Sequence, residues 1–373
     1  SPNQRREGCT VAILIYIFLT IGVSLISYFS QYRRYANNTS ISYKTSVGLF
    51  NTPWMCIILI SIILSLYSGS LDSEGLVDRV NYFRGFLMNQ YYGSLETILD
   101  SRTEPGYIII SMIIREMTSD WFWFFFSMTF IVSVIHLYTL SNMSFKYTSV
   151  LLLYMLSSYF FLGTYLLKQA LALSFANLAI LSYLRNQSWR YFLFSCFSCA
   201  FHFSAIILFP VFFIFKHANS INSLFILVSL VILLIFLVPL LSFVLSMLPS
   251  IEQYLYTEDT LVNEEQNILV MFKGTPFYFI TILALIKRKE LRKIMNESDV
   301  FVISSVFFSI SWILTYHHYW IFRIGLYFML PTLVLIPMLL NTIKEKNLRF
   351  ISFIIIYIPM IAINFRSILL ILR

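Results

Sequence analysis

The sequence predicts an all-α fold, a polytopic helical membrane bundle of about 10–12 membrane segments, some of them re-entrant or broken. Two observations carry this prediction. Hydrophobic residues make up 58% of the 373 residues and charged residues only 12%, against about 25% charged in soluble domains. Apolar runs of about 17 residues or more recur along the chain, each long enough to span hydrocarbon. We therefore expect residues 1–373 to form a single integral membrane domain.

About ten of the apolar runs are expected to cross the membrane. They are Val11–Phe29, Val47–Ser68, Trp121–Ser141, Tyr147–Leu162, Lys168–Leu184, Ile221–Leu248, Leu269–Ile286, Val300–Tyr316, Ile324–Leu340 and Phe350–Leu370. Pro105–Met117 is apolar but too short to cross. It is predicted to be an interfacial or re-entrant helix with Pro105 in its first turn.

The charges of the connecting loops predict which side of the membrane each loop faces. Short loops rich in Lys and Arg face the cytoplasm. The loops at 31–44, 142–146, 185–190, 216–220, 287–298 and 341–349 are basic, whereas those at 69–104, 249–268 and 317–322 are acidic or mixed. We expect the first group inside and the second outside, with 69–104 and 249–268 as outer (periplasmic) loops 1 and 2. Both termini then lie outside.

One segment conflicts with a simple count of crossings. Arg190 and Lys216 are both assigned inside, so Tyr191–Phe215 between them must either not cross or be a broken helix. Pro210 and the polar interruption at His202 are compatible with both. Irregular backbone at membrane depth is tolerated only where protein or a water-filled cavity covers it. We predict a bent or re-entrant element with His202 near its apex.

Short motifs follow one another in a fixed order beside these segments. They are Asp78-Arg79-Val80-Asn81-Tyr82-Phe83-Arg84-Gly85-Phe86, Glu104-Pro105-Gly106-Tyr107, Lys168-Gln169-Ala170-Leu171-Ala172 and Phe201-His202-Phe203-Ser204-Ala205, with Arg323 ahead of Tyr327-Phe328. Over residues 45–335 the chain resembles the O-antigen polymerase (Wzy) and EpsG-like family of bacterial polysaccharide polymerases. Lys168 departs from the family pattern, in which Arg is usual, and it keeps the charge without the bidentate guanidinium.

The resemblance implies a glycosyltransferase of the GT-C type in the bacterial inner membrane, multi-pass, with its active site facing the periplasm. Such proteins move a growing glycan from undecaprenyl pyrophosphate onto the next lipid-linked oligosaccharide repeat unit. The implied partners are that lipid-linked oligosaccharide and the bilayer, with a chain-length regulator protein as a possible third. The resemblance implies no metal and no cofactor. Nucleic acid is not an expected partner, because no basic domain with interleaved aromatic residues lies outside the membrane.

The chemistry of such a transfer indicates which side chains to look for. A pyrophosphate leaving group needs cations, and an acceptor hydroxyl needs a general base. Glu104 and His202 are the catalytic candidates. The substrate-binding candidates are Asp78, Arg79, Arg84, Lys168, Gln169, His317, His318 and Arg323. No cluster of residues at metal-ligand spacing is evident, and Cys196-x-x-Cys199 lacks a second ligand pair.

Each candidate also has a plainer structural role. Glu104 is near a helix start, where negative charge is favoured. Lys168 and Arg323 can snorkel to the membrane interface. Arg79 and Arg84 lie among acidic residues and can form solvated ion pairs. His202 can hydrogen-bond Ser198 one turn earlier. Both readings of each residue stay open at the level of the sequence.

Other functions compete with polymerisation. An O-antigen ligase catalyses the same kind of transfer to another acceptor. It usually has one very large outer loop, whereas the outer loops expected here are of moderate length. A flippase for the same lipid-linked sugar should show two related halves and charges at the bilayer midplane. Here the charges cluster at one face. A membrane acyltransferase is disfavoured, because no His-x3-Asp pair was found.

Overall fold

The computed structural model describes residues 20–23, 54–71, 77–88, 103–144, 147–157, 159–160, 164, 166–218, 274–315 and 319–371, without the side chains of 77, 319, 320 and 360–371. Every regular element among these residues is helical, as the sequence predicts. The chain forms two compact units, Ser1–Ile206 with Met360–Arg373, and Ile207–Pro359. The expectation of one integral domain stays a prediction.

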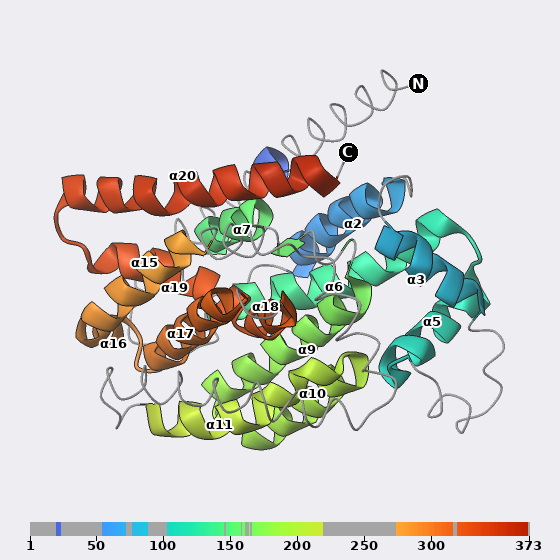
Figure 1. Ribbon diagram of the computed structural model, residues 1–373, viewed down its shortest axis with the longest axis horizontal. Coiled ribbons are helices and arrows are strands. Elements are labelled where there is room, and N and C mark those ends of the chain that lie inside the picture. Colours follow the sequence, from blue (N-terminus) through green and yellow to red (C-terminus); the bar gives the residue numbers. More distant parts are fainter. Residues whose placement is uncertain are drawn as a thin grey trace. The chain divides into compact units, whose positions relative to one another are not determined.

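The helices of the first unit pack side by side. They are α2 (Trp54–Ser70), α3 (Val77–Met88), α5 (Pro105–Met117), α6 (Trp121–Met143), α7 (Tyr147–Leu156), α9 (Leu167–Leu184) and α10 (Ser188–Phe201). α2 lies along α6, while α9 packs on α6 and on α10 (Figure 1). α5 contacts α3, α6 and α10.

Three of the described helical stretches are long and apolar enough to cross a membrane, namely Trp121–Met143, Leu167–Leu184 and Ile321–Thr342. They correspond to three of the expected crossings. Their shared property is apolarity on most faces, which marks helices that are buried or lie in lipid. α6 begins where the Asp120 side chain accepts a hydrogen bond from the Trp123 N–H at 3.2 Å. Such an N-cap satisfies one of the helix's unpaired donors.

α9 and α10 form a helical hairpin that ends at His202. Asn186, in the tight turn between them, has a φ of 56°, a left-handed conformation that asparagine tolerates better than most residues. α10 ends at Phe201, because His202 adopts an extended conformation with φ −161° and ψ 120°. A 3₁₀ turn, η2 (Phe203–Ile207), follows. The predicted helix interruption at His202 is therefore confirmed.

A buried polar network ties α9 to α6 and α7. His136 Nε2 lies 3.1 Å from Ser174 Oγ, and His136 Nδ1 lies 3.2 Å from the Tyr154 hydroxyl. The Ser174 hydroxyl donates to the Ala170 carbonyl at 2.8 Å, so it accepts from the imidazole. Ser174 of α9 and Tyr154 of α7 thus contact the two ring nitrogens of His136 of α6. This network holds α9, whose first turn carries Lys168, against α6 and α7.

The second unit is organised around α17. Its helices are α11 (Leu208–His217), α15 (Thr275–Ile286), α16 (Arg288–Ile294), α17 (Ser298–Leu314), α18 (Tyr319–Gly325), η4 (Leu326–Phe328), α19 (Met329–Thr342) and α20 (Lys346–Ile371), the last of which extends past the unit. α17 contacts α15, α16, α18 and α19. Gly325 lies so close to Ser311 that a Cβ would overlap its hydroxyl.

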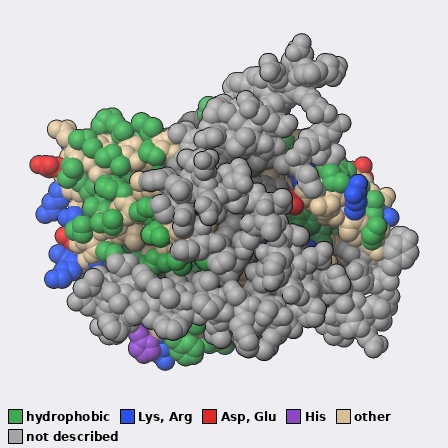
Figure 2. Space-filling model, viewed as in Figure 1, with side chains coloured by type: hydrophobic (Ala, Val, Ile, Leu, Met, Phe, Trp, Pro, Cys, Tyr) green, Lys and Arg blue, Asp and Glu red, His purple; other side chains and the backbone are tan. Residues whose placement is uncertain are grey.

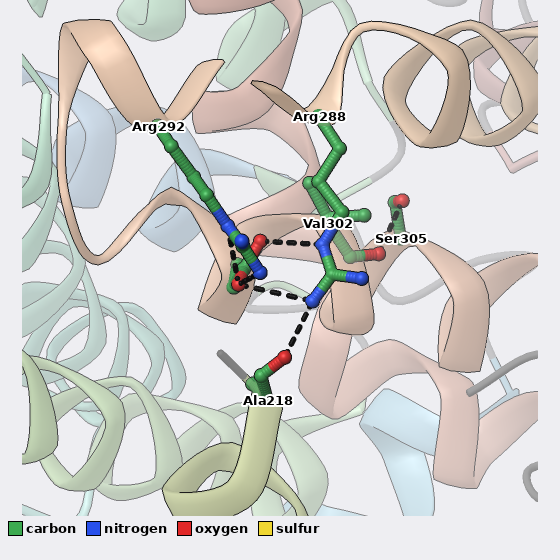
Figure 3. A network of polar contacts seen from close by, with 6 residues as sticks. Ala218, Arg288, Arg292, Val302 and Ser305 are labelled. Carbon is green, nitrogen blue, oxygen red and sulfur yellow. Dashed lines mark hydrogen bonds and ion pairs between the residues drawn. The ribbon is translucent and has the colours of Figure 1, made fainter. Parts of the chain in front are cut away.

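A buried ion cluster holds α16 against α17 and α11. Asp299 accepts hydrogen bonds from Arg288 Nε at 2.7 Å and Arg288 Nη2 at 3.0 Å, and also from Arg292 (Figure 3). Arg288 Nη2 also donates to the Ala218 carbonyl at the end of α11. The exposed fractions are 7% for the Arg288 side chain and 2% for that of Asp299. Buried charges of this kind must be paired to be tolerated.

The predicted segments agree with the structure to different degrees. Pro105–Met117 is a helix with the predicted bounds, although its interfacial location stays a prediction. The segment 69–104, expected as a polar loop, contains helix α3. Ile221–Leu248 and the loop 249–268 lie outside the described residues, as do His317 and His318.

Candidate active site

Three side chains chosen from the sequence meet in the first unit. Lys168 Nζ lies 2.9 Å from Glu104 Oε2, and His202 Nδ1 lies 3.5 Å from Glu104 Oε1. They come from the residue before α5, the first turn of α9 and the residue after α10. The Lys168, Glu104 and His202 side chains are 15%, 24% and 21% exposed. These residues, the Glu104 cluster, are therefore sheltered but reachable.

Glu104 is the N-cap residue of α5, yet its side chain does not cap the helix. Its backbone carbonyl accepts from the N–H groups of Tyr107 and Ile108 at 3.1 and 3.2 Å. Pro105 at the first helical position lacks an N–H, so it leaves no donor to satisfy there. The carboxylate is thus available to Lys168 and His202 instead of stabilising the helix end.

Gly106 lets α5 approach the end of α10. A Cβ at this position would lie 2.8 Å from the Ala200 carbonyl oxygen and 3.2 Å from Phe201 Cδ1. Both are rigid neighbours, one of them backbone. The Glu-Pro-Gly sequence therefore brings Glu104 to within reach of the residue that follows Phe201.

We expect Gly106→Ala to move α5 away from α10 and lengthen the contact between Glu104 and His202. A displacement of about 1 Å can cost about 10²-fold in rate. The measurements are the activity and the helix content of the purified variant. Gly85→Ala is the matched control, because nothing lies within 4 Å of a Cβ there. Equal rates for the two variants would show that this close approach does not matter.

His202 is directed toward Glu104 by the way α10 ends. Its backbone N–H donates to the Ser198 carbonyl at 3.0 Å. The Ser198 hydroxyl donates to the Ala172 carbonyl at 2.6 Å and so ties α10 to α9. The alternative role of His202, a ring bonded to the Ser198 side chain, does not describe this geometry. The Nδ1 atom instead faces the Glu104 carboxylate.

Lys168 is held between an anion and an aromatic ring. Besides its ion pair with Glu104, its ammonium lies 5.4 Å from the centre of the Tyr107 ring. The Tyr107 hydroxyl donates to the Tyr82 carbonyl of α3 at 3.3 Å. Burial raises the pKa of this phenol, so it remains protonated. Sequence reasoning did not list Tyr107 as a site residue, although it closes the Glu-Pro-Gly-Tyr motif.

Arg79 makes its described contacts within the protein, and its expected role in substrate binding stays a prediction. It is fully buried. Its guanidinium donates to the carbonyls of Thr164 at 3.1 Å, Ser68 at 2.8 Å and Leu71 at 3.4 Å, and lies 3.7 Å from the centre of the Phe125 ring. Burial lowers the pKa of Arg79 to about 9, so the group stays charged at neutral pH. Arg79 therefore joins α2, α3 and α6 to the segment before α9.

We expect Arg79→Gln to destabilise the protein and Arg84→Gln to leave its stability unchanged. Loss of the buried guanidinium removes its three hydrogen bonds to backbone carbonyls, each worth about 1.5–3 kcal/mol for a charged donor. Arg84 is exposed on the same helix and donates to no backbone carbonyl among the described residues. The thermal midpoints of the two purified variants decide the comparison. Matching midpoints would contradict the structural role given to Arg79.

The structure also describes Asp78, Arg84, Gln169 and Arg323. Asp78 and Arg84 are exposed on α3, with Asp78 in the first turn, where a negative charge favours the helix. Gln169 is 2% exposed. Arg323 is half-buried on α18 of the second unit.

The described helices, three of them of spanning length and apolarity, define a helical membrane protein with a sheltered cluster of ionisable side chains. A family model described as the EpsG family matches residues 54–370. The chain belongs to the EpsG family, the family of Wzy-like polysaccharide polymerases. The predicted family is thereby confirmed, and with it a polysaccharide polymerase-type role in general terms. Neither curated proteins nor solved structures provide a match.

Proposed function

We propose that this protein is a GT-C-type glycosyltransferase of the bacterial inner membrane that polymerises undecaprenyl-pyrophosphate-linked repeat units at the periplasmic face. Membership of the EpsG family supports the polymerase class. The observation that supports this choice of active site is that the Glu104 carboxylate lies between Lys168 and His202. A carboxylate beside a histidine is the arrangement that acid–base transfer chemistry uses.

In this proposal Glu104 orients His202, and His202 is the general base. A carboxylate facing Nδ1 holds the proton on that nitrogen and leaves Nε2 as the acceptor. The hydroxyl of the incoming repeat unit gives its proton to Nε2 as its oxygen bonds to the anomeric carbon of the growing glycan. The bond from that carbon to the pyrophosphate oxygen breaks, and its electron pair leaves with the lipid pyrophosphate.

Lys168 has two tasks in the proposed site. Its ammonium neutralises Glu104 while the site is empty. It also supplies a cation for the negative charge that grows on the pyrophosphate, since an ammonium with three donors can serve two anions. The Tyr107 ring lies against its ammonium, and Arg79 of α3 bonds the Thr164 carbonyl in the segment before α9. The other proposed substrate-binding residues are Asp78, Arg79, Arg84, Gln169, His317, His318 and Arg323.

We expect Lys168→Ala to reduce chain extension by about 10²–10³-fold, the usual cost of removing a group that stabilises developing charge. Lys168→Arg should retain much of the activity, because it keeps the charge and restores the residue usual in the resembled family. Polymer length and rate, at matched protein abundance in the membrane, are the measurements. An alanine variant that makes polymer of wild-type length would reduce Lys168 to an interface anchor.

The proposed function is tested by incubating the purified full-length protein with a synthetic undecaprenyl-pyrophosphate-linked repeat unit and separating the products by size. A ladder of lengths identifies a polymerase. A single transfer to a lipid A core acceptor would identify a ligase instead. Movement of the lipid-linked sugar across the bilayer with no new bond would identify a flippase.

A further inference from the structure

Exposed apolar side chains near the end of α15 are followed closely in the sequence by exposed cations on α16. Ile282 and Ile286 are 58% and 68% exposed near the end of α15. Lys289 and Lys293 are exposed on α16, which starts after the single turn residue Lys287. In Figure 2 hydrophobic and basic side chains adjoin at the left edge, where Figure 1 places α15 and α16.

The described acidic groups of this region, Glu290, Glu297, Asp299 and Glu345, are fewer than its lysines and arginines. Glu290 pairs with Lys287 at 3.6 Å, and Asp299 is shared by Arg288 and Arg292. Within the described part of the chain, neither Lys289 nor Lys293 has an ion pair within 4.0 Å. The Arg292 side chain keeps 36% of its surface exposed even while bonded to Asp299. The face of α16 therefore carries a net positive charge toward its surroundings.

The same pattern recurs after α19, which contacts α16. Lys344 is exposed in the connection to α20 and Lys346 at the first position of α20, with the exposed Glu345 between them. The first turns of α20 then expose Leu348, Phe350 and Ile351 by 50%, 64% and 50%. Two neighbouring connections of the second unit thus each join exposed cations to exposed apolar residues. The cations Lys289, Arg292, Lys293, Lys344 and Lys346 are called the basic surface below.

We propose that the basic surface binds the headgroups of anionic phospholipids. Lysine side chains at a membrane boundary reach the phosphate level while apolar neighbours contact the acyl chains. The exposed isoleucines of α15 and the exposed residues of α20 supply that apolar neighbourhood, which an acidic soluble partner would leave exposed to water. The cations of this surface attract anionic lipid headgroups, so the charges of the surface and of the lipid are complementary.

The ion cluster fixes the orientation of the basic surface. Arg288 is bidentate to Asp299 and donates to the Ala218 carbonyl (Figure 3). α16 is thereby attached to α17 and α11 on its buried side, which leaves Lys289 and Lys293 on the outer side. A preorganised set of cations loses little freedom when a headgroup binds.

The test compares retention of two lipids by the purified full-length protein. Native mass spectrometry is run with dioleoylphosphatidylglycerol and with dioleoylphosphatidylcholine at equal concentration. The wild type should retain the anionic lipid preferentially. Lys289→Gln/Lys293→Gln should lose about 25-fold of this preference, at about fivefold for each basic residue near an anionic surface. Lys289→Arg/Lys293→Arg should keep it, and Glu290→Gln should not lower it.

Equal preference for phosphatidylglycerol in the wild type and in the Lys289→Gln/Lys293→Gln variant would overturn the proposal. Loss of preference in the charge-keeping arginine variant would also overturn it, because charge would then not be the cause. Binding of an acidic protein that depends on these lysines, without any lipid preference, would assign the surface to that protein instead. None of these outcomes depends on the polymerase activity.

Discussion

His202→Asn should slow glycan chain extension by about 10²–10⁴-fold, the range that general acid–base catalysis contributes. Asparagine keeps a polar side chain but cannot accept the hydroxyl proton. Glu104→Gln should cause a loss of similar size, because an amide no longer holds the imidazole proton on Nδ1. The rate of ladder formation by purified protein measures both effects.

We expect His202→Asn and Glu104→Gln to keep the helices of the wild type. Glu104 caps α5 through its backbone carbonyl, so the Gln variant retains that contact. His202 lies beyond the end of α10 and its backbone bond to Ser198 is also retained. Protein abundance and helix content should match the wild type. Near-normal extension by His202→Asn at normal abundance would remove His202 from the chemistry.

Asp299→Asn should give a large loss of stability, about 3–5 kcal/mol. That is the usual cost when one partner of a buried ion pair is removed and the other stays buried and charged. The partner here is Arg288, whose side chain is only 7% exposed. The change should appear as a lower thermal midpoint of the purified protein.

The matched comparisons lie within the same cluster. Arg292→Gln should cost much less than Arg288→Gln, because the Arg292 side chain is 36% exposed and its loss leaves Asp299 paired with Arg288. Glu290→Gln removes only a partly exposed pair with Lys287 and should leave the midpoint nearly unchanged. Equal midpoints for Asp299→Asn and Glu290→Gln would mean that the cluster does not hold α16 in place.

Helix positions were the part of the fold that the sequence predicted well. α5, α6 and α9 begin and end within two residues of the predicted segments, because Pro105, Asp120 with Trp121, and Arg185 mark where apolar runs begin or stop. The break at His202 followed from its polar neighbours within an apolar run. The helix α3 was missed, since Val77–Met88 alternates charged and apolar residues without a long apolar run.

Which of the predicted site residues would meet could not be read from the sequence, because their contacts join segments that are far apart in the chain. The pairing of Glu104 with Lys168 and His202 joins three elements, and no spacing within one segment reveals it. The burial of Arg79 was equally invisible, because its partners Ser68 and Thr164 offer backbone carbonyls that carry no sequence signal. The order of the short motifs selected the right segments, and the structure determined which side chains meet.

The most direct test of the account is a double-mutant cycle on Glu104 and His202 in the chain-extension assay. Rates are measured for the wild type, Glu104→Gln, His202→Asn and the double variant. If Glu104 acts through His202, the double variant should be no slower than the slower single variant, because residues that act as one unit are strongly non-additive. Losses that multiply, with the double variant slower by the product of the two single effects, would show that the residues act independently and would contradict the proposed site.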